Sequence, residues 1–208
     1  MTAGKLIMRA GQRGLWHPKH LSPSVLSAWW CADDHGTARM TDDGAGLISN
    51  WVDRAGGLAV TAATSARPTW TSNAFNSAYA GLTVDGVANC FVTTSLASLP
   101  TGSTPGEIWA VGNSAVVGGD ACGYGNNTAG QTRSLRVSSA GLSSVTDRSV
   151  FLVGQAAWTT PQIVKGDWSG TAMNGYSTGT PFAGNPATIA TLATATTRLR
   201  RGAATAPS

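Results

Sequence analysis

The sequence has little of the charge that exposed helical faces carry. Only 12% of its 208 residues are charged, with a single Glu and three Lys. This scarcity argues against an all-helical bundle, because surface helices draw heavily on these two residue types. No stretch approaches the ~18 consecutive apolar residues of a transmembrane helix, and the basic N-terminus lacks the apolar block of a secretory signal. We therefore expect synthesis in the cytoplasm without a signal peptide, and no membrane partner.

Cysteine is also scarce. Cys31, Cys90 and Cys122 are odd in number and widely spaced, so they form neither a CxxC pair nor a disulfide framework. We expect them to be thiols in the interior. His17 and His20 lie three residues apart but have no third ligand nearby, which is too few for zinc.

What the chain does have is Gly, Trp and turn residues. It contains 26 Gly, eight Trp and 42% apolar residues, enough to bury a sizeable core. Short apolar, β-type runs alternate with turn clusters such as DDG, GG and NN, as in β-sandwiches and barrels. The predicted strands are residues 25–30, 48–52, 58–61, 82–84, 90–93, 107–111, 134–137, 150–153, 162–165 and 197–200.

Positive charge gathers at the two ends of the chain, although the net charge is only +4. Residues 1–22 carry four basic residues and no acid, whereas residues 23–197 hold more acids than bases. So short a segment cannot form its own core, so we expect an extended N-terminal arm over residues 1–22 and one folded domain over residues 23–208. The acidic body argues against nucleic acid as the main ligand. The predicted docking residues of the arm are Lys5, Arg9, Arg13, Trp16 and Lys19.

Several segments, in this order, resemble concanavalin A-like (laminin-G-like) jelly-roll domains of phage and bacterial surface proteins. They are residues 27–34 (SAWWCADD), 48–56 (ISNWVDRAG), 66–70 (ARPTW), 81–86 (GLTVDG) and 197–203 (TRLRRGA). The third and fourth are similar to the family pair RPxY/W and VxFDG. The resemblance implies an all-β fold, a concanavalin A-like jelly-roll β-sandwich with an extended N-terminal arm.

The chain departs from the family pattern where Thr83 and Val84 replace the aromatic residue that is usual before the Asp-Gly turn. Family members also continue past the RxGA strand into a closing strand. An earlier segment or a neighbouring copy would fill that place here, since an open sheet edge recruits a partner. In the second case the chain forms a homo-oligomer, which is the arrangement that we expect.

The motifs also have a direct physical interpretation. Trp29, Trp51, Trp70 and Trp109 lie in or beside apolar strands, and we expect them to supply much of the core. Asp53 is expected to accept hydrogen bonds from the loop amides that follow it, as in an Asx turn.

No catalytic pattern stands out. Some enzymes on this fold hydrolyse glycans with two carboxylates in an E-x-D-x-x-E arrangement, but Glu107 has no acid at positions 109–112. No G-x-S-x-G elbow is present either. We predict a protein that is not an enzyme, with no catalytic residue and no required cofactor.

Calcium is the one metal that the sequence leaves open, because jelly rolls that bind sugars often hold it with Asp and Asn oxygens. The best loop candidates are Asp120, Asn126 and Asn127.

A sugar site would combine a stacking aromatic ring with amide or acid groups on a loop. The candidates are Tyr124, Trp168, Asn174 and Tyr176. The alternative is that these loops are packed by their own aromatic residues.

The resemblance implies the setting, and the lack of a catalytic pattern indicates a binding or assembly role. We therefore predict a non-enzymatic structural component of a phage or phage-like particle, located in the virion: a head decoration or fibre, or a tail or baseplate appendage. It would dock by its arm onto other virion proteins and display the jelly roll. The alternative is an adhesion or receptor-binding module that recognises host-surface carbohydrate.

Overall fold

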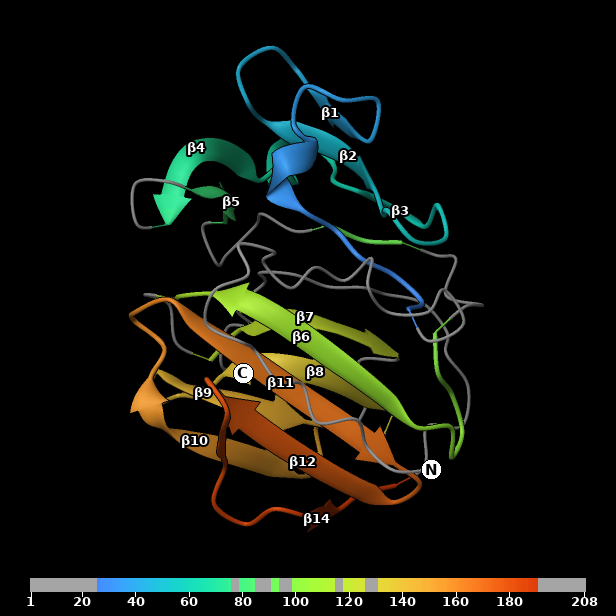
Figure 1. Ribbon diagram of the computed structural model, residues 1–208, viewed down its shortest axis with the longest axis vertical. Helices are drawn as coiled ribbons and strands as arrows, with labels where there is room; N and C mark the ends of the chain where they lie inside the picture. Colours follow the sequence, from blue (N-terminus) through green and yellow to red (C-terminus); the bar gives the residue numbers. More distant parts are fainter. Residues whose placement is uncertain are drawn as a thin grey trace, which may run out of the picture.

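Figure 1 shows a computed structural model, which describes residues 26–75, 79–84, 91–93, 99–114, 118–125 and 131–190. Its regular structure within these ranges is strands plus two 3₁₀ turns, η2 (Ala32–Asp34) and η3 (Thr64–Ala66). This confirms the all-β prediction. None of the described segments is a helix that is long and apolar enough to cross a membrane. The arm and the strand expected at 197–200 lie outside the described residues.

The described residues between 26 and 93, which we call the N-terminal lobe, form the upper part of Figure 1. A three-stranded antiparallel sheet is built from β1 (Met40–Asp42), β2 (Ile48–Val52) and β3 (Ala59–Thr61). A hairpin, β4 (Thr69–Phe75) with β5 (Tyr79–Thr83), lies beside it. The core of this lobe is made of Met40, Ile48, Trp51, Val60, Leu82 and Phe91.

The described residues between 99 and 190, the C-terminal lobe, form two antiparallel sheets (Figure 1). One is a meander of β7 (Asp120–Gly125), β8 (Thr132–Val137), β9 (Leu142–Thr146) and β10 (Phe151–Ala157). The other joins β6 (Gly106–Gly112), β11 (Gln162–Ser169), β12 (Ala172–Ser177) and β13 (Thr180–Pro181), with β14 (Ala187–Thr188) on β12.

The two sheets of the C-terminal lobe pack face to face around one core. Its buried members are Leu135, Val137, Val145, Leu152, Trp158, Val164, Trp168, Met173, Phe182 and Ile189. The packing is close enough to require glycine at Gly175, where a Cβ atom would lie 2.3 Å from the Phe182 ring. The core therefore fixes which face of β12 points inward and which points away.

Local sequence located some of these strands and missed others. The predicted strand at 48–52 coincides with β2, whereas β1, β7, β9 and β12 were not predicted. The strand expected at 25–30 is wrong over its described part, since the Trp29 carbonyl accepts one bond from the Arg54 amide but no strand forms there. Cys31 and Cys122 are half-buried, so neither is fully in the interior as predicted, although Cys122 packs against the core of the C-terminal lobe.

Candidate functional site

The sheet that contains β6, β11 and β12 turns one face to the core and the other to solvent, because side chains alternate along a strand. Val164 and Trp168 on β11 and Met173 on β12 point into the core. The intervening residues define what we call the outer face: Glu107, Trp109 and Val111 on β6, Ile163, Lys165 and Asp167 on β11, and Asn174 and Tyr176 on β12.

An aromatic row crosses the outer face. Strand register places Lys165 opposite Trp109 on one side and opposite Tyr176 on the other. The Lys165 ammonium lies 5.2 Å from the centroid of the Trp109 ring and 5.1 Å from that of Tyr176. Both distances suit cation–π attraction. Trp109 is nevertheless 57% exposed, an unusual position for a tryptophan on a sheet.

A polar row lies next to the aromatic one. Register places Asp167 opposite both Glu107 and Asn174. The Lys165 Nζ is 2.9 Å from Glu107 Oε1 and 3.1 Å from Asp167 Oδ2. Trp109 Nε1 donates to Glu107 Oε2 at 2.9 Å, and Asn174 Nδ2 donates to Asp167 Oδ1 at 2.7 Å. The two rows are thus joined into one network around the ammonium group.

This network favours the positively charged form of Lys165. Burial alone would lower the pKa of Lys165, but hydrogen bonds and charges from Glu107 and Asp167 outweigh it and raise the pKa above its ordinary value. The side chain therefore stays protonated, and its ammonium holds the surrounding groups in place at neutral pH.

A hollow of about 220 Å³ lies on this face, lined by Trp109, Ile163, Lys165, Tyr176 and Gly179. Its rim is the tight turn from β12 to β13, where Thr178 and Gly179 have φ of 47° and 85°. Positive φ at both central residues is typical of a type I′ turn, which favours glycine. With no side chain at Gly179, the hollow stays open beside Tyr176.

The structure divides the four residues predicted for sugar binding. Asn174 and Tyr176 lie on the outer face, on strand β12 and not on a loop. Trp168 and Tyr124 are only 4% and 5% exposed, so the prediction that they stack on a ligand is wrong. Burial, partly offset by the Arg133 charge, raises the pKa of Tyr124 to about 12.

The structure also contradicts the prediction that Asp120 is a calcium ligand. Asp120 lies on β7 and not on a loop, is 6% exposed, and its carboxylate pairs with the guanidinium groups of Arg136 and Arg148. Ser134 Oγ donates to the same carboxylate at 3.4 Å. Two cations already compensate this charge, so Asp120 does not present a calcium ligand. Asn126 and Asn127 lie outside the described residues.

No cluster of three or more His, Cys, Asp or Glu suited to a metal occurs within the described ranges.

The sequence analysis did not identify four residues of the outer face as site residues: Trp109, Glu107, Lys165 and Asp167. Trp109 was expected in the core, which is wrong. The signal was the alternation in Glu-Ile-Trp-Ala-Val, which places Trp109 on the same face as Glu107. In β11 the same alternation separates Lys165 and Asp167 from the core residues.

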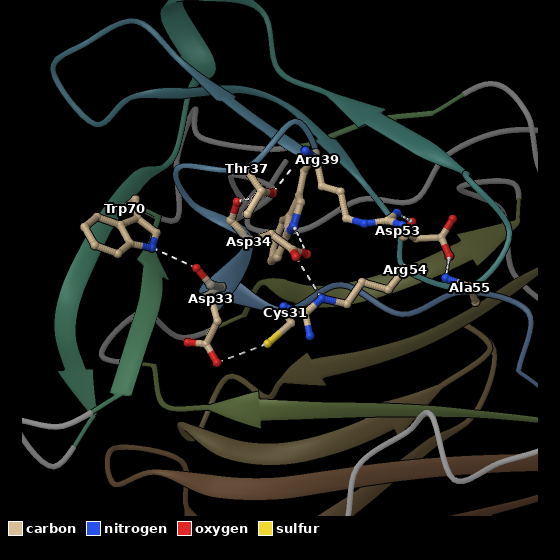
Figure 2. A network of polar contacts seen from close by, with 11 residues as sticks. Cys31, Asp33, Asp34, Thr37, Arg39, Asp53, Arg54, Ala55 and Trp70 are labelled. Atoms are coloured by element: carbon tan, nitrogen blue, oxygen red, sulfur yellow. Dashed lines mark hydrogen bonds and ion pairs between the residues drawn. The ribbon is translucent and has the colours of Figure 1, made fainter.

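A second polar network, shown in Figure 2, lies inside the N-terminal lobe. Arg54 Nε donates to Asp34 Oδ1 at 2.8 Å, and Trp51 Nε1 donates to Asp34 Oδ2 at 3.4 Å. Trp70 Nε1 donates to the Ala32 carbonyl at 2.9 Å. With Asp34 only 3% exposed, these bonds hold residues 31–34 against β2 and β4 and leave no room for a ligand.

Asp53 stabilises the turn after β2 (Figure 2). Its Oδ1 accepts from the amides of Ala55 at 2.6 Å and Gly56 at 2.8 Å, and its Oδ2 accepts from the amide of Leu58. The side chain is fully buried. This confirms the prediction of an Asx-type turn and shows that Asp53 is structural.

Comparisons of the chain with models of known protein families, with curated proteins and with solved structures found no match.

Proposed function

We propose that this chain is a non-enzymatic binding protein whose outer face binds carbohydrate. The observation that carries the proposal is the exposed Trp109 ring, held in one row with Lys165 and Tyr176. Aromatic rings offer flat apolar surfaces on which the C–H faces of a sugar ring pack. Glu107 and Asp167 lie beside these rings, where their oxygens can accept bonds from sugar hydroxyls.

The two carboxylates favour binding over hydrolysis. Glycoside hydrolases need one carboxyl protonated as an acid while the other is charged. Glu107 and Asp167 instead share one counter-ion, with the Lys165 ammonium within 2.9 Å of the first and 3.1 Å of the second. We propose that these groups orient a sugar and do not cleave it.

A glycan array with purified protein tests the role, followed by titration of the best ligands. We expect Trp109→Ala and Tyr176→Ala each to weaken binding by about tenfold or more, because stacking aromatics are typical binding hot spots. Phe151→Ala is the matched control, since Phe151 is 49% exposed but lies on β10, in the opposite sheet. Absence of glycan binding, or equal loss in the control, would overturn the proposal. New reducing ends released from host polysaccharide would show an enzyme instead.

We also propose that the protein is a structural component of a phage or phage-like particle, built as a concanavalin A-like jelly roll. Two packed antiparallel sheets support this fold. A contact between two of the segments that carry the resemblance, residues 27–34 and 48–56, also supports this fold. Asp34 of the first segment accepts hydrogen bonds from Trp51 and Arg54 of the second. Its partners would be other virion proteins and further copies of the chain.

Deleting residues 1–22 tests the particle role. We expect the truncated protein to keep its β-type circular dichroism and its melting temperature but to be lost from assembled particles. Full occupancy of the truncated protein in purified particles would contradict an arm that docks.

A further inference from the structure

The hydrogen-bonding groups of the outer face are unequally engaged. Four of its donor hydrogens already point at its own acceptors: two from Lys165 Nζ at Glu107 and Asp167, one from Trp109 Nε1 at Glu107, and one from Asn174 Nδ2 at Asp167. One ammonium hydrogen, one amide hydrogen and the Tyr176 hydroxyl are the further donors of the face. A carboxylate has about four lone-pair sites, so each acid still has acceptor capacity after these bonds. The face is thus richer in acceptors than in donors.

The charge of the face has the same bias. Glu107 and Asp167 contribute two negative charges and Lys165 one positive charge, and both acids contact the lysine. The Glu107 side chain is 50% exposed, whereas Asp167 is 21% and Lys165 20% exposed, and the lysine is flanked by the two aromatic rings. An approaching ligand therefore meets the Glu107 carboxylate before it meets the ammonium group.

From these two observations we propose that the outer face selects an uncharged sugar polymer, whose hydroxyls donate to Glu107 and Asp167, and rejects polymers that carry carboxylate or phosphate. The proposal rests on the carbohydrate-binding role above and adds the class of ligand. An anionic sugar brings acceptors to a face that has fewer remaining donors than acceptors, and its charge is repelled by the net negative charge there.

The length of the ligand follows from the position of the rings. Trp109 and Tyr176 lie on β6 and β12, with β11 between them. Two strand spacings separate them by about 10 Å, which is longer than a single sugar ring. A short oligomer that runs across the strands contacts both rings, so we expect pentasaccharides to bind more tightly than monosaccharides.

Matched oligomers test this selection. Cellopentaose and β-1,4-mannopentaose are each compared by calorimetry with the counterpart oxidised from alcohol to carboxylate at C6, alongside an array that holds neutral and acidic glycans. At low salt we expect each acidic oligomer to bind at least about tenfold more weakly than its neutral partner, with the gap narrowing as salt screens the repulsion. We also expect neutral glycans to head the array.

Glu107→Gln sharpens the test, because it removes one negative charge and supplies an amide donor at the same place. We expect the ratio of neutral to acidic affinity to fall by about threefold or more in this variant. Asp43→Asn, an acid in the N-terminal lobe, is the control and should leave the ratio unchanged. Acidic oligomers that bind as tightly as neutral ones, with both lost in Trp109→Ala, would overturn the selection and leave the carbohydrate role intact. No binding of any glycan would overturn both.

Discussion

The two lobes contain the same three kinds of group in the same contacts, but the acid and the indole are buried in one lobe and exposed in the other. The cations are alike, with Arg54 24% and Lys165 20% exposed. In the N-terminal lobe, Asp34 accepts from the Trp51 indole and from Arg54. In the C-terminal lobe, Glu107 accepts from the Trp109 indole and contacts Lys165. Trp51 is 5% exposed and Trp109 is 57% exposed. We call these sets the buried triad and the exposed triad.

The difference shows that residue type does not decide the role of such a triad. In the buried triad the polar groups satisfy one another where water is excluded, and removing one leaves its partners without a hydrogen bond. In the exposed triad water replaces a lost partner at little cost, so these contacts add little to folding. The buried triad therefore stabilises the fold, whereas the exposed triad is accessible to a ligand.

The largest expected effect compares the two tryptophans. Trp51→Ala should lower the free energy of unfolding by about 3–5 kcal/mol, because it removes a large buried ring and leaves a cavity. Trp109→Ala should lower it by less than about 1 kcal/mol, since the ring is mostly exposed. Urea denaturation followed by circular dichroism measures both. Equal losses in the two variants would break the comparison.

The acids give the next effect. Asp34→Ala should cost about 2–4 kcal/mol of folding free energy, because Trp51 and Arg54 lose a buried partner. Glu107→Ala should cost less than about 1 kcal/mol, as expected for an exposed ion pair. The same urea experiment compares them. A loss for Glu107→Ala as large as that for Asp34→Ala would show that the exposed triad also supports the fold.

The contrast between core and surface extends to glycine. Gly175→Ala places a Cβ atom 2.3 Å from the Phe182 ring and should cost about 1–3 kcal/mol through overpacking. Gly112→Ala, in β6, meets no atom within 4 Å of its Cβ and should change stability by less than about 0.5 kcal/mol. Thermal melts of the two variants provide the test, and a neutral Gly175→Ala would show that the core can relax.

The smallest effect appears only at high pH. Burial raises the pKa of Tyr124 to about 12 from an ordinary value of 10.0. The unfolded chain therefore loses this proton first as pH rises, so the stability linked to it is complete below about pH 10 and is lost toward pH 12. In spectroscopic titration at 295 nm, one tyrosine should ionise near pH 12, and Tyr124→Phe should abolish that step. A titration unchanged in this variant would contradict the assignment.

Local sequence patterns were enough to predict the turn after β2, since the Asp53 carboxylate bonds only to amides within five residues of itself. They were not enough for the outer face, because its groups come from three strands and β6 is distant in sequence from β11 and β12. The alternation of polar and apolar residues within β6 was enough to predict the orientation of Trp109, yet the ring was assigned to the core by its apolar character alone. Asp120 was taken for a loop ligand because its arginine partners lie on other segments.

The two-residue period of β6, β11 and β12 has an evolutionary consequence. Positions that fill the core and positions that face solvent alternate along the same strands. Substitutions on the solvent side can therefore accumulate and would change which ligand the proposed site binds, while purifying selection preserves the packing behind them.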